Sequence, residues 1–140
     1  RHFGLDPVLD WQLPVSETAT REIQTRLDVN KKLFVINPCA AAKAKNWRNW
    51  NAESYAAIAD YIAEQYDMQI VLTGGSSSLE KQTAKKIATL CKKAQPINLV
   101  AATNLDELVA ILNLANMVLA PDTGPVHIAS ALGTPTIGIY

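Results

Sequence analysis

The sequence has little that would serve a metal, a redox centre or a nucleic acid. Its two cysteines, Cys39 and Cys91, lie far apart in the chain and match no zinc or redox spacing. We interpret them as reduced thiols of an intracellular, cytoplasmic protein. Lysine plus arginine and aspartate plus glutamate number 13 each, and this zero net charge argues against a nucleic-acid-binding surface. No apolar run approaches the roughly 20 residues of a membrane span.

Several catalytic fingerprints are missing as well. The sequence contains no G-x-G-x-x-G, no G-x-x-x-x-G-K-[ST], no H-E-x-x-H, no cluster of Cys and His, and no G-x-S-x-G. A nicotinamide-type site, a P-loop site, a protein-bound metal and a serine hydrolase are therefore not indicated. Zero net charge still allows a small basic pocket for one phosphorylated ligand.

The composition is that of one folded domain. The chain has 140 residues, of which 49% are hydrophobic and 19% charged, which favours a single soluble core. Residues 1–14 read as a linker, and a short helix is expected over about 17–27 with Ser16 as its N-cap. We therefore divide the chain into a linker with a leading helix, 1–29, and a domain, 30–140. Because the chain opens without methionine and stops inside an apolar run, we expect it to be part of a longer protein.

From residue 33 onward, short apolar runs alternate with segments of helical periodicity. Continuous apolar runs such as Leu33–Ile36 are typical of strands buried on both faces. The alternation indicates an α/β fold, a Rossmann-like parallel sheet with helices on both faces. The predicted strands are 33–36, 69–73, 97–99, 117–120 and 136–140.

Capping patterns place the starts of the helices between these strands. Ser77 with Glu80, and Asn104 with Glu107, form capping-box patterns, and Asn51 is suited to a simple N-cap. The lysines of the helix after Ser77 are interpreted as a solvated outer face. Residues expected on the inner faces of the helices include Tyr66, Leu79 and Leu105, and Gly133 is expected to end the last helix.

Ligands of such sheets bind beyond the carboxyl ends of the strands, so the loops at that edge carry the functional prediction. In the turn 121–126, Pro125 suits a first helical position, and Thr123 and Gly124 would present backbone N–H groups to a phosphate. Asp122 could accept hydrogen bonds from sugar hydroxyls, with His127 facing the same mouth. A plain helix cap at Asp122 and an ordinary surface or core histidine at 127 fit the residue types at least as well.

Two further loops at this edge admit a nucleotide. Residues 38–50 place lysine and arginine side chains among small residues, which suits a diphosphate, although a solvated loop pinned by its tryptophans fits too. We interpret Trp47 and Trp50 as structural. Gly74 and Gly75 after the second strand allow either a simple turn or a nucleotide lying over the strand end.

Four segments together resemble a known family. They are Phe34-Val-Ile-Asn-Pro-Cys, Lys45-Asn-Trp-Arg-Asn-Trp, Val71-Leu-Thr-Gly-Gly and the block from Asp122 to Pro135, in order over roughly residues 30–140. Their pattern is similar to glycosyltransferase family 9, the lipopolysaccharide heptosyltransferases. The resemblance implies the C-terminal, donor-binding half of a GT-B glycosyltransferase, with the domain truncated at its C-terminus and the N-terminal acceptor domain absent.

The resemblance also implies a reaction. The enzyme would invert the anomeric centre while moving a heptose from ADP-heptose to the lipopolysaccharide inner core, without a cofactor or a protein-bound metal. The missing domain would supply the catalytic base and bind the lipid-linked saccharide acceptor. This fragment alone would be inactive, and any peripheral contact with the cytoplasmic face of the bacterial inner membrane would belong to the parent protein.

Matching the family's motifs gives the expected donor-binding residues. Lys45 would contact the diphosphate and give electrostatic support to its departure. Ser76 occupies the place of a family glutamate, with Glu80 a helical turn further on, and alanines replace the family's hydroxyl residues after the first strand. The expected donor-binding residues are Ala40, Ala41, Lys45, Gly74, Gly75, Ser76, Thr103, Leu105, Asp122, Thr123, Gly124 and His127.

Two alternatives stay open at this point. Another GT-B nucleotide-sugar enzyme, such as a hexosyltransferase or an epimerase, would keep the fold and the diphosphate site. A non-catalytic, doubly wound nucleotide-binding or receiver-like module would keep the fold alone. The acidic cluster typical of receiver modules is not visible at the end of the first strand.

Overall fold

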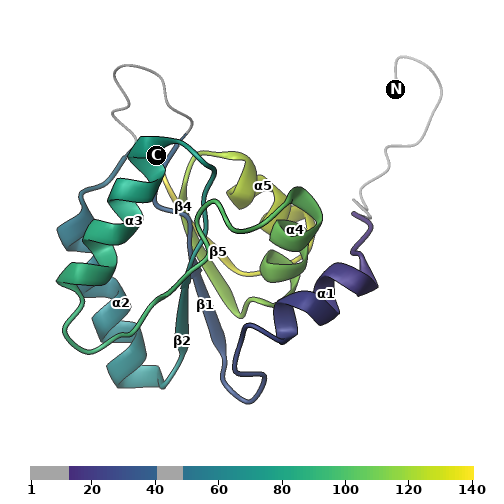
Figure 1. Ribbon diagram of the computed structural model, residues 1–140, viewed down its shortest axis with the longest axis horizontal. Coiled ribbons are helices and arrows are strands. Elements are labelled where there is room, and N and C mark those ends of the chain that lie inside the picture. The colour runs from purple at the N-terminus through teal and green to yellow at the C-terminus, as the bar shows by residue number, and fades with distance from the viewer. Residues whose placement is uncertain (1–12, 41–48) are drawn as a thin grey trace, which may run out of the picture.

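The computed structural model describes residues 13–40 and 49–140. Strands and helices alternate along the described chain (Figure 1). The elements are α1 (Glu17–Gln24), β1 (Leu33–Ile36), α2 (Ala52–Tyr66), β2 (Gln69–Leu72), α3 (Ser78–Leu90), β3 (Ile97–Asn98), α4 (Leu105–Leu114), β4 (Met117–Pro121), α5 (Gly124–Ala131) and β5 (Thr136–Ile139).

The five strands form one parallel sheet in the order β3-β2-β1-β4-β5. The chain first builds outward from β1 to β3 and then returns to place β4 on the other side of β1. The carboxyl ends of β1 and β4 therefore flank the point where the winding direction reverses, which is where open α/β sheets bind ligands. The predicted fold class is confirmed.

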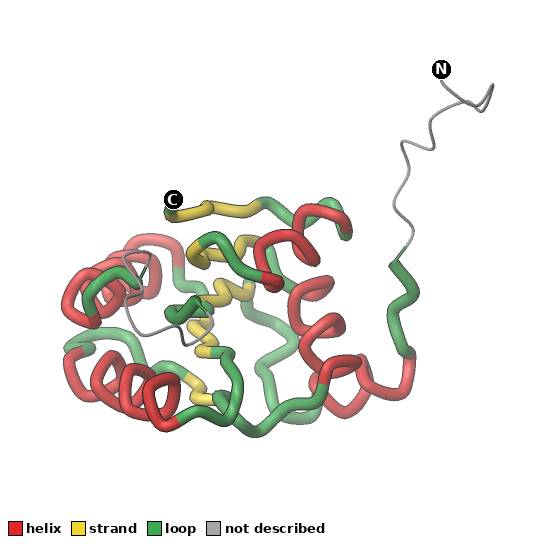
Figure 2. Tube along the Cα trace, turned by 90° about the horizontal axis from the view of Figure 1, so that it is seen from above, coloured by secondary structure: helices red, strands yellow, loops and turns green. Residues whose placement is uncertain are grey.

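Helices cover both faces of the sheet, as expected. Figure 1 shows α2 and α3 on one side and α1, α4 and α5 on the other, and the view from above in Figure 2 shows the same layers. Side chains of β1 alternate accordingly: Phe34 and Ile36 join the core under α2 and α3, whereas Val35 joins the core under α1, α4 and α5. All four residues of β1 are buried.

The helix ends follow the local sequence signals. Ser77 with Glu80 and Asn104 with Glu107 both form complete capping boxes. At the other end of α5, Gly133 has φ +75°. Its N–H donates to the carbonyl of Ser130 and that of Thr134 donates to Ala129, the paired bonds of a Schellman ending. These ends confirm the predicted caps.

Three expected inner-face residues are exposed instead, so those predictions are wrong. Leu79 and Leu105 lie in the first turns of α3 and α4, next to the rim beyond the carboxyl edge of the sheet. Tyr66 is the last residue of α2 and stacks edge-on with Tyr61 at 6.0 Å between ring centroids. The helical periodicity of apolar residues in the sequence does not show where a helix extends beyond the edge of the sheet. The exposed fractions are 43% for Leu79, 66% for Leu105 and 58% for Tyr66.

Helix α1 packs into the core that α4 and α5 cover on their face of the sheet, because Ile23 is fully buried in that core. The division of the chain at residues 29 and 30 stays a prediction.

At the start of α5, Gly124 rather than Pro125 is the first helical residue. None of the helices in the described ranges is long and apolar enough to cross a membrane.

Candidate functional site

An open pocket of about 380 Å³ lies where the carboxyl ends of β1, β2 and β4 meet the starts of α4 and α5. Its volume falls within the roughly 300–1,000 Å³ common for ligand pockets. Four separate loops contribute to it, so the fold gathers segments that are far apart in the sequence. The lining residues are Asn37, Cys39, Gly74, Gly75, Glu80, Thr103, Asn104, Leu105, Leu108, Thr123, Gly124 and Pro125.

The start of α5 forms one wall and is suited to an anion. The hydroxyl of Thr123, the N-cap residue, donates to the carbonyl of Pro121 at 3.1 Å and does not cap the helix. Within residues 13–40 and 49–140, the N–H of Gly124 has no hydrogen-bond acceptor. A Cβ at Gly124 would meet nothing within 4 Å, so this backbone is open to the pocket. Free N–H groups and the positive end of the helix together favour a phosphate here.

Glu80 stands at the opposite wall, beside the glycines that follow β2. Its Oε1 accepts from the N–H of Gly75 at 2.7 Å, and its Oε2 accepts from the hydroxyl of Ser77. A Cβ on Gly75 would lie 3.0 Å from the Glu80 carboxylate, so the glycine makes room for this contact. The carboxylate is thereby fixed at the pocket, where it can accept hydrogen bonds from ligand hydroxyls.

The start of α4 forms an apolar lip. Leu105 lines the pocket with most of its side chain uncovered, next to Thr103 on the same loop. The side chain of Asn104 accepts from the N–H of Glu107 at 2.9 Å, which fixes the turn that carries both residues. An exposed leucine held on a capped helix start is suited to packing against a flat ring of a ligand.

The floor of the pocket comes from the end of β1. The N–H of Asn37 donates to the carbonyl of Leu119 at 2.9 Å, which extends the ladder between β1 and β4 by one residue. Cys39 lies buried just beyond. Burial raises the pKa of the Cys39 thiol, against the opposing effect of a hydrogen bond with Thr83. The thiol is therefore protonated at neutral pH.

The structure brings together six of the predicted donor-binding residues in this pocket. The other six lining residues are not among the predicted donor-binding residues: Asn37, Cys39, Glu80, Asn104, Leu108 and Pro125. Glu80 is predicted from the sequence as a helix cap, one helical turn beyond the position of the family glutamate. A single asparagine after a strand forms no pattern that identifies Asn37. The predicted residues that line the pocket are Gly74, Gly75, Thr103, Leu105, Thr123 and Gly124.

The remaining predicted residues do not line the pocket or lie outside the described residues. Nε2 of His127 lies 3.1 Å from Oδ1 of Asp122 at the outer side of the α5 start. Ser76 is exposed on the rim. The N–H of Ala40, which was expected to face the donor, instead donates to Oδ1 of Asn49 at 2.7 Å. Ala41 and Lys45 belong to the segment that the structure does not describe, as does Trp47.

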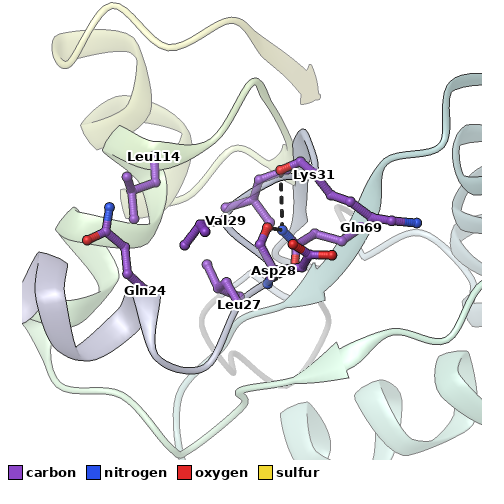
Figure 3. Close-up of a pocket in the computed structure, with 8 residues that line it drawn as sticks. Gln24, Leu27, Asp28, Val29, Lys31, Gln69 and Leu114 are labelled. Carbon is purple, nitrogen blue, oxygen red and sulfur yellow. Dashed lines mark hydrogen bonds between the residues drawn. The ribbon is translucent and has the colours of Figure 1, made fainter.

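A second, smaller pocket lies at the opposite end of the sheet (Figure 3). It measures about 90 Å³ and sits between the end of α1 and the start of β2. The carboxamide of Gln69 crosses it, donating to the carbonyl of Asp28 at 2.6 Å and accepting from the N–H of Asp28 at 3.1 Å. Because these polar groups hydrogen-bond one another, we interpret this pocket as part of the structural contact between α1 and the sheet.

No three His, Cys, Asp or Glu side chains of the described part of the chain come together as a metal site would require. The expectation that the protein works without a bound metal or a cofactor stays a prediction. Trp50, in the described part of its loop, packs edge-on against buried Tyr55 with 5.6 Å between ring centroids. This contact agrees with a structural role for Trp50.

Known proteins match the chain over almost its whole length. The model of glycosyltransferase family 9 (heptosyltransferase) matches residues 2–140. The lipopolysaccharide core heptosyltransferase OpsX of Haemophilus influenzae is 34% identical over 130 residues, which cover 93% of this chain and 36% of that protein. Lipopolysaccharide heptosyltransferase 3 of Escherichia coli is 28% identical over 134 residues, covering 94% of this chain and 38% of that protein. The chain thus spans little more than a third of these relatives.

Solved structures of related proteins share the fold of this chain. The E. coli ADP-heptose lipopolysaccharide heptosyltransferase II superposes with a TM-score of 0.81 at 25% identity, over 96% of this chain and 41% of that one. A family 9 glycosyltransferase from Veillonella parvula gives a TM-score of 0.78 at 22% identity, over 91% of this chain and 36% of that one, and shows the shared fold. With its parallel sheet and its family match over residues 2–140, the chain belongs to glycosyltransferase family 9, the heptosyltransferase family.

Proposed function

We propose that this chain is the donor-binding part of a GT-B heptosyltransferase and that its pocket binds the nucleotide of ADP-heptose. The observation that carries this proposal is the pocket at the reversal point of the sheet, with the open start of α5 as one wall. The names of the relatives supply the donor, since one of the similar structures is called an ADP-heptose heptosyltransferase.

Each wall of the pocket suits one part of such a donor. The N–H of Gly124 and the start of α5 would bind the diphosphate, with Lys45 as its counter-charge. Leu105 and Thr103 would pack against the base. Glu80 would accept from hydroxyls of the ribose or the sugar, because its carboxylate is held at the pocket. Asp122 and His127 lie just outside, and we assign them to the heptose, which extends from the diphosphate toward the acceptor.

These groups would act mainly on the leaving diphosphate. In the transfer, an acceptor hydroxyl oxygen bonds to the anomeric carbon as the bond from that carbon to the diphosphate breaks. The hydroxyl proton passes to a base outside this chain, and negative charge builds up on the diphosphate. The start of α5 and Lys45 would stabilise that charge without reorganising, the electrostatic contribution on which many enzymes rely.

The rest of the reaction belongs to parts of the protein beyond these 140 residues. A second domain would bind the lipid-linked saccharide of the lipopolysaccharide inner core and carry the catalytic base. We infer that the complete enzyme works at the cytoplasmic side of the bacterial inner membrane. The chain alone is then expected to bind donor and to transfer nothing.

Calorimetric titration of the chain tests this function. ADP and ADP-heptose should bind, UDP-sugars should bind at least about tenfold more weakly, a difference of 1.4 kcal/mol or more, and no heptose should move to an added acceptor. Lys45→Ala should weaken the binding of both ADP ligands. Lys85→Ala is the matched control, because it removes a lysine from the exposed face of α3.

The outcomes separate the candidate functions. Preference for a UDP-sugar would make the chain part of another nucleotide-sugar enzyme. Binding of neither nucleotide would favour a module without a donor site. Equal losses in the Lys45 and Lys85 variants would mean that overall charge, and not a specific contact, governs the affinity.

A further inference from the structure

Three buried polar side-chain atoms in the described part of the chain have no hydrogen-bond partner: Oδ1 of Asn37, Oγ1 of Thr73 and the hydroxyl of Tyr55. A buried polar group without a partner costs roughly 1–3 kcal/mol, so folded proteins rarely keep one without a reason. Of the three residues, Asn37 alone lines the pocket. The residue is only 4% exposed, so the pocket is where a partner can reach its side chain.

The strand pattern explains why Asn37 faces the pocket. Val35 points to the core under α4 and α5, and Ile36 points to the core under α2 and α3. Because side chains alternate along a strand, Asn37 points to the same face as Val35, between the starts of α4 and α5. Leu105 and Gly124 line the same pocket from those two helices.

We propose that the carboxamide of Asn37 contacts the donor directly and hydrogen-bonds a hydroxyl of the bound nucleotide sugar. This inference rests on the proposed function. A phosphate oxygen cannot donate a hydrogen bond to Oδ1, whereas a hydroxyl both donates and accepts and can satisfy either end of a carboxamide. The donor carries such hydroxyls on its ribose and on its sugar, and the test distinguishes the two sources.

Thr73 provides a matched control. It follows Leu72, which pairs with Ile36, so Thr73 lies beside Asn37 at the end of the neighbouring strand. Its Oγ1 is also buried without a partner, but the residue does not line the pocket. Asn37→Leu and Thr73→Val each replace an unpartnered polar atom by an apolar one of similar shape. Neither change should lower the melting temperature of the unliganded chain, because such replacements are nearly neutral or stabilising.

Titration of the chain with ADP and with ADP-heptose, beside thermal unfolding without ligand, tests the proposal. N37L should bind ADP-heptose about 2- to 12-fold more weakly, which corresponds to one neutral hydrogen bond. T73V should bind like the wild type. An equal loss for ADP identifies the ribose as the source of the hydroxyl, and a loss for ADP-heptose alone identifies the sugar. If N37L does not fold, N37A carries the same comparison.

Two results would overturn the inference while leaving the donor site intact. N37L could bind both ligands as tightly as the wild type, as expected if a water molecule satisfies Asn37. T73V could lose as much affinity as N37L, which would trace the loss to repacking of the strand ends. If the wild type bound neither ligand, the proposed function itself would fail, and the inference would fall with it.

Discussion

Nη2 of Arg26 lies 3.1 Å from Oε1 of Glu107, so the segment after α1 is tied to the start of α4. The other guanidinium nitrogen, Nη1, donates to the carbonyl of Ala102 at 3.0 Å. The second carboxylate oxygen of Glu107 accepts from the N–H of Asn104 at 2.8 Å. One arginine therefore supports both ends of the loop that carries Thr103 to the pocket.

Arg26→Met should lower the free energy of unfolding by about 1–2 kcal/mol, because it leaves the Glu107 carboxylate without its counter-charge. The side chain of Glu107 is 8% exposed and that of Arg26 39%, so solvent screens the pair only in part. Urea unfolding measures the loss. Arg21→Met is the control, since Arg21 pairs with Glu17 at 3.2 Å on the exposed face of α1 and should cost less than about 0.5 kcal/mol. Equal losses in the two variants would contradict this account.

Gly124→Ala should separate ligand binding from stability. The added methyl meets nothing within 4 Å, and Gly124 has no positive φ, so the unliganded fold should be unchanged or slightly stabilised. The same methyl stands where a phosphate would approach the N–H of Gly124. ADP affinity should therefore fall about tenfold or more, a loss of at least 1.4 kcal/mol, as measured by calorimetry.

Gly133→Ala should behave in the opposite way. Its methyl also meets nothing within 4 Å, but Gly133 has φ +75°, which an alanine adopts at a cost of about 1 kcal/mol. This residue follows the far end of α5, away from the pocket. The melting temperature should drop while ADP affinity stays the same. A Gly124→Ala variant that bound ADP normally would show that the ligand does not approach this backbone.

Local signals made most of this fold predictable. The capping boxes at Ser77 and Asn104 and the glycine ending at Gly133 depend on residues three or four positions apart, so the sequence contains everything that determines them. The four all-buried residues of β1 are likewise evident as an apolar run. Leu105 was predicted to face inward, because its periodicity is that of a core residue. Only the position of α4 relative to the sheet edge decides that it forms the lip of the pocket.

The position of the pocket could be predicted from the sequence, but the individual residues that line it could not. Parallel strands end at one edge, so the loops after β1, β2, β3 and β4 had to meet there. Whether an individual side chain in those loops faces the pocket depends on contacts across the fold. Oδ1 of Asn49 accepts a hydrogen bond from the N–H of Ala40, and the carboxylate of Glu80 accepts one from the N–H of Gly75. Neither contact leaves a signal in the spacing of the sequence.

Both cysteines should be unreactive in the folded chain. Burial raises the pKa of Cys91 to about 11, with a further contribution from nearby Asp60, and burial also raises the pKa of Cys39. At pH 8 the thiolate fraction of Cys91 is then about one in a thousand, against roughly a quarter for a free thiol. Iodoacetamide labelling of Cys91, followed by mass spectrometry, should run at least about 100-fold slower in buffer than in urea. Equal rates would mean that Cys91 is accessible as a thiolate in the native chain.

Asp60 should make stability depend on pH. Its carboxylate accepts from the backbone N–H groups of Lys92, Lys93 and Ala94 at 2.8 to 3.1 Å, which fastens α2 to the segment after α3. Burial alone would raise the pKa of Asp60, but these three hydrogen bonds outweigh it and hold the pKa below its usual value. The charged form is thus favoured by folding. Its contribution is complete above the unfolded-state pKa of about 3.9 and disappears as the pH falls through the folded-state value.

Urea unfolding of the wild type and Asp60→Asn between pH 7 and pH 2.5 checks this linkage. The wild type should be more stable by a constant amount down to about pH 5, and the difference should shrink below about pH 4, since only the wild type loses a charge there. Asp67→Asn is the control, because Asp67 pairs with Lys31 on the exposed surface and should change the free energy of unfolding little. A difference between wild type and D60N that persists at pH 2.5 would mean that the oxygen atoms of Asp60, and not their charge, join α2 to the segment after α3.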